Sequence, residues 1–414
     1  MITPEQIDKA ATVLKDIVEH TPLQFNKRLS KKYNAKIYMK REDLQIVRSF
    51  KIRGAYYKIS LLTDEQKKQG VVCASAGNHS QGVAFACNNL KIHGTIFMPV
   101  VTPKQKVNKV KLHGDGYVTI KLVGNNFDEA FDASQKYCNK KNAIYVHPFD
   151  DEEVITGQAT VGKEIYEELK NKIDMVVTCE GGGGLTAGIC SYLAAVSPDT
   201  QIIACEPAGA AGLVTSRKAG HPVVLDAVDT FVDGAAVKSV GALPYKIMEK
   251  HVQQVVSVPE GQVATTMIEL YQYDGIIAEP AGALAIAGLE MMEKKDLEGK
   301  TIVCTISGGN NDILRYPEVM ERSLIYQGLK HYFIIEFTQK PGQLMKFLQE
   351  VLGPHDDIVL FEYMKKNNKE KGPALVGVEL ADKKDYDMLV KRFEDSGLEH
   401  KEITANDMIY RYLI

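Results

Sequence analysis

The sequence predicts an α/β protein with mainly parallel sheets, followed by a smaller α+β domain. Short apolar runs rich in β-branched residues alternate with helix-length segments from about residue 36 onward. After about residue 330 the pattern changes to strands with alternating polarity, separated by amphipathic helical segments. At 414 residues the chain is too long for one simple core, so we expect two or three domains.

The first predicted element is a helix near the N-terminus. Residues 3–6 (TPEQ) place a capping Thr, a first-turn Pro and a Gln at the capping-box position. Apolar residues then recur at helical spacing from Ile7 to Val18.

The α/β part follows as repeated strand and helix segments. The predicted strands are 36–40, 71–74, 95–99, 117–123, 175–179, 201–206 and 301–307. The predicted helices include 78–90, 103–113, 127–140, 157–169 and 185–195. The strands are continuous apolar runs, which is typical of parallel sheets covered by helices on both faces.

The C-terminal part has a different order of elements. We predict strands at 331–337, 358–364, 374–380 and 399–404, with helices near 344–351 and 384–395. A polar loop, KKNNKEKGP (365–373), separates the two middle strands. The resulting order, β-α-β-β-α-β, is ferredoxin-like.

Composition and charge exclude several kinds of partner. The net charge is −3 with both signs interleaved, so we expect neither nucleic acid nor a membrane surface as partner. No run approaches the ~20 apolar residues that span a bilayer, and we find no secretory signal. The seven cysteines are widely spaced, which indicates reduced thiols and no zinc site. We therefore expect a cytoplasmic protein that acts on a small molecule and holds no metal.

The first cluster with chemical potential is SFKIRGA (49–55), which opens a helix. A lysine in the first helical turn, beside Phe50 and Ile52, sits where a cation is disfavoured. Lys51 should therefore have a lowered pKa and supply the neutral amine that a Schiff base requires. Alone this is weak evidence, because 50 Lys and Arg residues offer many similar contexts.

The second cluster is SAGNHSQG (75–82), between a predicted strand and helix. Its small residues expose successive backbone N–H groups at a helix N-terminus, which suits a carboxylate. The alternative is a simple Asn cap on a turn. His79 taken alone is more often structural than a catalytic base.

The third cluster is GGGGLTAG (181–188), directly after a strand and opening a helix. Four glycines let backbone amides approach an anion, which favours a phosphate site. A dinucleotide site is the rival, because the spacing from Gly182 to Ala187 fits its fingerprint and Glu206 lies about 20 residues on. That rival places the glycines unusually late in the chain and gives Lys51 no role.

Together these motifs resemble the fold-type II (tryptophan synthase β-like) pyridoxal-phosphate enzymes, specifically the threonine dehydratases (threonine ammonia-lyases). Serine dehydratases and serine racemases are relatives. The matching segments are SFKIRGA (49–55), SAGNHSQGVA (75–84), GGGGLTAG (181–188), AEPAGAL (278–284) and SGGN (307–310). Their order and spacing agree across about 320 residues.

The resemblance implies a role for each matching residue. Lys51 would carry pyridoxal 5'-phosphate and remove the Cα proton, and Ser307 would face the pyridine nitrogen. Asn78 would contact the 3-oxygen, beside Phe50. The phosphate would be held by Gly181, Gly182, Gly183, Gly184 and Leu185. The substrate carboxylate would be held by Ser75, Ala76, Gly77, Asn78 and His79. Ser75 is also placed to serve as a second catalytic group on the opposite face of the cofactor.

The C-terminal part resembles the ACT-like regulatory domain of biosynthetic threonine dehydratases, in residues 340–358 and 368–380. The resemblance implies a catalytic domain over 1–328, with a small subdomain at about 45–150, and a regulatory domain over 329–414. It also implies deamination of L-threonine to 2-oxobutanoate and ammonia, as the first step of isoleucine biosynthesis. Isoleucine would inhibit the enzyme, and we expect a homotetramer. A domain kept only for oligomer assembly is the alternative.

Three other functions stay open from the sequence. Serine and threonine differ by one methyl group, worth only ~1–3 kcal/mol in a pocket, so we expect activity on L-serine too. A serine dehydratase or serine racemase of the same fold is therefore the main alternative. A non-catalytic amino-acid sensor is the alternative from another class. Glu206 has no assigned role.

Overall fold

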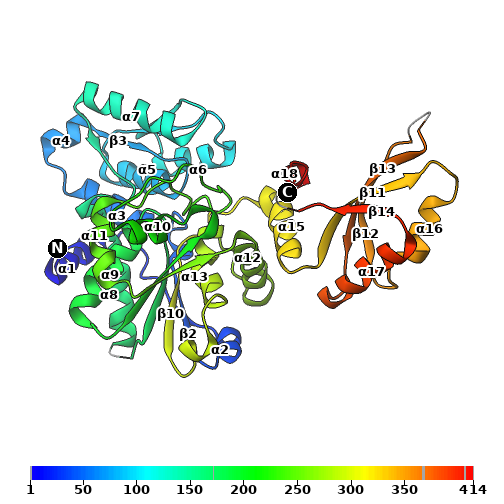
Figure 1. The fold of residues 1–414 in the computed structure, drawn as a ribbon. Coiled ribbons are helices and arrows are strands. Elements are labelled where there is room, and N and C mark those ends of the chain that lie inside the picture. The colour runs from blue at the N-terminus through cyan, green and yellow to red at the C-terminus, as the bar shows by residue number, and fades with distance from the viewer. Residues whose placement is uncertain (1, 171, 366–368, 405–406, 414) are drawn as a thin grey trace. The chain divides into compact units, whose positions relative to one another are not determined.

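The computed structural model describes residues 2–170, 172–365, 369–404 and 407–413 and divides into two compact units (Figure 1). Unit 1 is Met1–Asp312 and unit 2 is Ile313–Ile414. The sequence prediction places the domain boundary after residue 328. Helix α15 (Tyr316–Tyr326) therefore lies in unit 2 of the structure but in the predicted catalytic domain. The sequence of an amphipathic helix next to a domain boundary does not indicate which of the two domains the helix packs against.

The larger sheet of unit 1 has six strands in the order β1-β2-β10-β7-β8-β9. Its strands are β1 (Leu23–Phe25), β2 (Lys36–Arg41), β7 (Met175–Cys179), β8 (Gln201–Pro207), β9 (Gln254–Val258) and β10 (Thr301–Ile306). Only β1 runs antiparallel to its neighbour; the other pairs are parallel.

The smaller sheet of unit 1 has four parallel strands in the order β5-β4-β3-β6. They are β3 (Val71–Ala74), β4 (Gly94–Met98), β5 (Val118–Leu122) and β6 (Ile144–Tyr145). The prediction of an α/β fold with mainly parallel sheets is confirmed. Strands β1, β6 and β9 were not predicted, and the first two have only three and two residues.

Helices connect and cover these sheets, and their names run in chain order. They are α1 (Pro4–Leu14), α2 (Lys27–Tyr33), α3 (Lys51–Ser60), α4 (Asp64–Gln69), α5 (Asn78–Leu90), α6 (Lys104–Gly114), α7 (Phe127–Lys141), α8 (Glu152–Leu169), α9 (Gly184–Val196), α10 (Gly212–Ala219), α11 (Ala242–His251), α12 (Glu260–Asp274), α13 (Pro280–Leu289) and α14 (Lys294–Leu297). The capping box at Thr3 and Gln6 is present, as predicted. Helix α8 begins at Glu152, five residues before its predicted start, because Asp151 caps it through Val154 N.

Glycines let the helices around α3 approach closely. A Cβ on Gly54 of α3 would lie 2.5 Å from the backbone oxygen of Val154 on α8. A Cβ on Gly82 of α5 would lie 3.0 Å from the backbone oxygen of Lys51. Helix α3 is therefore held between α5 and α8 by backbone-level contacts.

Unit 2 contains an antiparallel sheet in the order β12-β13-β11-β14. Its elements after α15 are β11 (Lys330–Thr338), α16 (Gln343–Glu350), β12 (Asp357–Tyr363), β13 (Lys371–Glu379), α17 (Tyr386–Ser396), β14 (Glu399–Glu402) and α18 (Tyr410–Leu413). Alternate residues of β11 pack with Phe347 of α16 and Phe393 of α17 in one core, so both helices cover the same face. The ferredoxin-like order is confirmed.

One predicted boundary in unit 2 is wrong. Strand β13 starts at Lys371, inside the segment predicted as a loop, and Lys371 pairs with Thr338 of β11. Pairing along the whole of β11 extends the strand beyond its apolar part. Residues 366–368 of the predicted loop lie outside the described residues.

Two composition-based expectations can be checked in the structure. All seven cysteines are free and buried. Across the described ranges, no helix has both the length and the apolar content that a membrane crossing requires.

Candidate active site

The predicted site motifs lie at the carboxyl ends of three strands and at the helices that follow. Strand β3 leads into Ser75, β7 into the glycine loop and β10 into Ser307. The Phe50 amide donates to the Ser307 carbonyl at 3.2 Å, and Ser49 pairs with Gly308 in an antiparallel bridge. Motifs about 250 residues apart therefore form one site, as the rule for open α/β sheets predicts.

Lys51 is the first residue of α3 and is partly buried. Its Nζ donates to the Pro148 carbonyl at 2.9 Å and lies 5.2 Å from the centre of the Phe50 ring. Burial lowers the pKa of Lys51 to about 8, against the opposing effects of Cys179 and Glu279. The lysine can therefore be neutral near physiological pH, as the sequence predicted.

A tight turn after β6 positions the Pro148 carbonyl. The Nδ1 atom of His147 accepts hydrogen bonds from the amides of Phe149 and Asp150, at 3.3 and 2.7 Å. Burial lowers the pKa of His147 to about 4, so its ring stays neutral and Nδ1 remains an acceptor. The Asp150 carboxylate then accepts from the first amides of α11.

The loop before α5 holds the residues predicted to bind a carboxylate. The Ser75 Oγ accepts from the Gly77 amide at 3.2 Å, and Gly77 precedes the first turn of α5. Ala76 is half-buried in this loop. The His79 ring points elsewhere: it is buried, and its Nε2 bonds to the Val146 carbonyl at 2.8 Å. Burial lowers the pKa of His79 to about 3, so only its backbone can serve an anion in this loop.

Asn78, the first residue of α5, is held by two polar neighbours. Its Nδ2 donates to Glu279 Oε1 at 2.5 Å, and its Oδ1 accepts from Asn310 Nδ2 at 2.8 Å. Glu279 belongs to the AEPAGAL segment and Asn310 to the SGGN segment. The amide is thus fixed between two further motifs.

The glycine loop joins β7 to α9 and has no room for side chains. A Cβ on Gly182 would lie 2.2 Å from the Phe149 ring, and one on Gly181 would lie 2.7 Å from the Ala235 carbonyl. Gly183 has φ +93°, a conformation that favours glycine. Gly184 and the buried Leu185 begin α9, so the loop presents backbone amides at a helix N-terminus.

Ser307 directly follows strand β10 and is buried. Its hydroxyl donates to the Ala281 carbonyl at 3.1 Å. A hydroxyl is a rotatable donor and acceptor, so Ser307 can serve a ring nitrogen.

Three buried carboxyl groups surround these motifs. Burial raises the pKa of Glu180 to about 8 and that of Glu279 to about 7. Glu206, whose role the sequence left open, accepts from the amides of Leu213 and Val214 at 2.8 and 2.9 Å. It caps helix α10, so the glutamate that fitted a dinucleotide fingerprint has a structural partner of its own.

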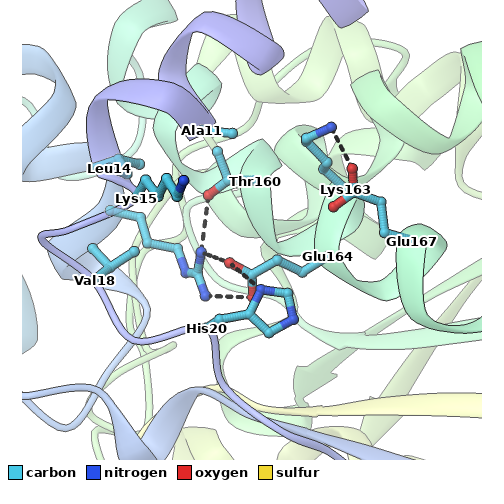
Figure 2. A pocket seen from close by; sticks show the side chains of 10 residues that line it. Ala11, Leu14, Lys15, Val18, His20, Thr160, Lys163, Glu164 and Glu167 are labelled. Carbon is cyan, nitrogen blue, oxygen red and sulfur yellow. Dashed lines mark hydrogen bonds and ion pairs between the residues drawn. The ribbon is translucent and has the colours of Figure 1, made fainter.

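A hollow of about 210 Å³ lies apart from this site, along α1 and α8 (Figure 2). Arg53 contributes to its lining, together with Glu164, Lys163 and Glu167. Arg53 donates to Glu164 and to Thr160, and Lys163 pairs with Glu167, so opposite charges balance there. Its lining contains none of the predicted site residues.

Comparison with known families agrees with this geometry. The sequence model described as "Pyridoxal-phosphate dependent enzyme" matches residues 14–308. The chain belongs to the pyridoxal-phosphate-dependent enzyme family. A second model, described as the C-terminal regulatory domain of threonine dehydratase, matches residues 321–413. Pyridoxal phosphate is therefore the cofactor of this pyridoxal-phosphate-dependent enzyme.

Two curated relatives match almost the whole of this chain. The biosynthetic L-threonine dehydratase of Bacillus subtilis is 51% identical over 414 residues, covering 100% of this chain and 98% of the relative. That of Halalkalibacterium halodurans is 50% identical over 410 residues, covering 99% of each chain.

Solved structures support the same fold. The processed form of threonine deaminase isoform 2 from Solanum lycopersicum has a TM-score of 0.72 and 36% identity, covering 78% of this chain and 94% of that one. Maize serine racemase has a TM-score of 0.71 and 28% identity, covering 78% and 98%. The fold-type II assignment is confirmed.

The residues of the site fit this cofactor. The glycine loop offers backbone amides to a phosphate at positions where a Cβ would collide with Phe149 or Ala235. Lys51 offers an amine with a lowered pKa, and Ser307 offers a hydroxyl. The phosphate, the aldehyde and the ring nitrogen of the cofactor therefore each have a chemically matching group at this site.

Several residues at the site had no assigned role from the sequence. They are Pro148, Phe149, Glu279, Asn310 and Lys109. Glu279 and Asn310 lie inside the AEPAGAL and SGGN motifs, so their presence in these motifs could have indicated that they belong to the site. Pro148 and Phe149 follow a two-residue strand, and Lys109 is one of many lysines, so local patterns did not distinguish them.

Proposed function

We propose that this enzyme converts L-threonine to 2-oxobutanoate and ammonia. The observation that carries the proposal is the amine of Lys51, which has a lowered pKa and lies where five motifs converge. Similarity over the whole chain to biosynthetic L-threonine dehydratases supports the choice of substrate. The reaction balances, because threonine has the atoms of 2-oxobutanoic acid plus ammonia.

We assign the cofactor contacts as follows. Lys51 would hold pyridoxal phosphate covalently, Asn78 would contact its 3-oxygen and Ser307 would serve its ring nitrogen, beside Phe50. The phosphate would be held by Gly181, Gly182, Gly183, Gly184 and Leu185. The bound cofactor supplies an electron sink for the negative charge left at the substrate Cα.

The residues of the chain supply binding and proton transfer. The loop of Ser75, Ala76, Gly77, Asn78 and His79 orients the substrate carboxylate through backbone N–H groups. The neutral Lys51 amine accepts the Cα proton at Nζ, and its pKa near 8 suits that role at physiological pH.

L-Serine deamination is the second activity that we propose. The two substrates differ by one methyl group, so discrimination of more than about 200-fold is not expected from a pocket alone. Serine racemase activity requires a second proton-transfer group on the opposite face, and Ser75 is the candidate. The structural likeness to maize serine racemase is the observation that keeps this alternative.

We propose that unit 2 binds isoleucine and thereby inhibits the enzyme, at the first step of isoleucine biosynthesis. The match of residues 321–413 to the threonine dehydratase regulatory domain supports this. We also propose a cytoplasmic homotetramer. Its catalytic domain would cover 1–328, and its regulatory domain, 329–414, would be unit 2 without residues 313–328. Light scattering after size-exclusion chromatography tests the tetramer directly.

The test of the reaction is a comparison of substrates on one preparation. Holoenzyme is assayed for 2-oxobutanoate from L-threonine, for pyruvate from L-serine and for D-serine by chiral chromatography. A higher kcat/KM for threonine, no D-serine and inhibition by isoleucine support the proposal. Dominant D-serine formation would replace it with a racemase.

A further inference from the structure

Four polar side chains form a hydrogen-bond chain that crosses unit 1. Lys109 Nζ on α6 donates to Asn310 Oδ1 at 3.0 Å. Asn310 Nδ2 donates to Asn78 Oδ1 at 2.8 Å, and Asn78 Nδ2 donates to Glu279 Oε1 at 2.5 Å. Helix α6 follows a strand of the smaller sheet, whereas Asn310 and Glu279 belong to segments around the larger sheet.

The lysine end of this chain determines its direction. An ammonium group can only donate hydrogen bonds, so Asn310 presents its amide oxygen to Lys109 and its amide nitrogen to Asn78. Asn78 then presents its oxygen to Asn310 and its nitrogen to Glu279. Asn310 Nδ2 also donates to the Val47 carbonyl at 2.8 Å, which opposes reversal of that amide.

We propose that Lys109 and Asn310 are positioning residues that fix the orientation of the Asn78 amide toward the cofactor. The inference rests on the proposed contact between Asn78 and the 3-oxygen. Without a donor at position 109, the Asn310 amide loses the partner that holds its oxygen. The Asn78 amide can then rotate, so its oxygen and nitrogen no longer keep one fixed orientation toward the cofactor.

A neighbouring lysine provides a control that distinguishes orientation of the Asn78 amide from a general role in holding helix α6 in place. Lys106, one turn earlier on α6, pairs with Asp233 Oδ2 at 2.6 Å, also on the side of the larger sheet. It makes an ion pair across the same junction, and it is not a member of the Lys109–Asn310–Asn78–Glu279 chain. Lys106→Met is therefore the matched control for Lys109→Met.

The experiment measures pyridoxal-phosphate affinity of the full-length apoenzyme, with no substrate present. We expect Lys109→Met to raise the dissociation constant about tenfold, the value of about one hydrogen bond to a charged group. The visible band of the bound cofactor should shift in the same variant. Lys109→Arg keeps a donor and should stay within about twofold of wild type, as should Lys106→Met.

Asn310→Asp provides a second, nearly isosteric test. Aspartate keeps the acceptor for Lys109 and removes the donor to Asn78, so affinity should again fall by about tenfold. Circular dichroism and thermal unfolding check that each variant is folded. Equal weakening in Lys109→Met and Lys106→Met, or wild-type affinity in Asn310→Asp, would overturn the inference.

The outcome is independent of the proposed reaction. An enzyme that makes no 2-oxobutanoate, yet shows the expected pattern of affinities, refutes the reaction and retains the orienting role. An enzyme that deaminates threonine, with wild-type affinity in both Lys109→Met and Asn310→Asp, refutes the orienting role alone.

Discussion

Lys51 Nζ donates a 2.9 Å hydrogen bond to the backbone carbonyl of Pro148, 97 residues further along the chain. That carbonyl is held by the turn in which His147 Nδ1 accepts two backbone amides. Lys51, the lysine that we propose binds the cofactor, is thus held by a backbone acceptor rather than by a carboxylate. Among the described residues Lys51 has no ion-pair partner, and burial outweighs the more distant carboxyl groups to lower its pKa to about 8.

The rate of cofactor attachment should follow this pKa. Only the neutral amine of Lys51 can bond to an aldehyde, and its neutral fraction falls about tenfold per pH unit below pH 8. We expect the attachment rate of apoenzyme to rise with pH and to level off above about 8. Stopped-flow absorbance between pH 6 and pH 10 measures it. A rate still rising steeply at pH 10 would indicate an ordinary exposed lysine.

Gly82→Ala should displace Lys51. The added Cβ would lie 3.0 Å from the Lys51 carbonyl oxygen and 3.2 Å from the Ile52 amide nitrogen. We expect unfolding free energy to fall by about 1–3 kcal/mol and kcat to fall with it. Urea unfolding and steady-state kinetics provide the two measurements. Gly212→Ala is the control, because its nearest neighbour is 3.9 Å away.

Glu180→Gln should change how stability depends on pH. Burial raises the pKa of Glu180 from 4.5 to about 8, although the neighbouring Thr186 hydroxyl favours the charged form. Between these pH values the folded state retains a proton that the unfolded state releases. Wild-type stability should therefore fall as pH rises, by up to about 1.4 kcal/mol per unit from this group.

The glutamine variant should lose that part of the slope between pH 5 and pH 8. Urea unfolding at several pH values measures it, with the exposed Glu65→Gln as control. The same slope in wild type and Glu180→Gln would show that the carboxyl is ionised in the folded protein at neutral pH.

Arg53→Met should be strongly destabilising. The fully buried guanidinium of Arg53 donates two hydrogen bonds to Glu42, at 2.8 and 2.7 Å, and two to Glu164, at 2.5 and 2.9 Å. Removing it leaves two carboxylates without their main partner, which costs about 3–5 kcal/mol. Lys67→Met breaks an exposed pair with Asp64 and should cost less than about 0.5 kcal/mol in the same assay.

The regular elements of the α/β part were predictable where apolar runs are continuous. Strands β3 and β7 and helix α5 occupy the predicted residues 71–74, 175–179 and 78–90. A glycine or a polar residue bounds each run at both ends, so both ends are marked in the sequence. Strand β6 has two residues and is defined by pairing with β3, which no local pattern shows.

The candidate site was also predictable only in part. The positions of Lys51, Asn78 and the glycine loop at helix starts were predictable, because the starts of helices have recognisable local chemistry. The partners that orient them were not. Asn78 meets Glu279 across 201 residues, and Lys109 meets Asn310 across the same separation, so only the folded structure joins them.

The most direct test of the central claim is a visible absorption spectrum of the purified protein and of Lys51→Ala, before and after L-threonine. 2-Oxobutanoate is assayed in the same cuvette. We predict a wild-type protein with a visible cofactor band that changes with threonine as the oxoacid forms. Lys51→Ala should show neither the band nor product. A wild-type protein that stays colourless with added pyridoxal phosphate and forms no oxoacid, or a Lys51→Ala protein with full activity, would contradict the account.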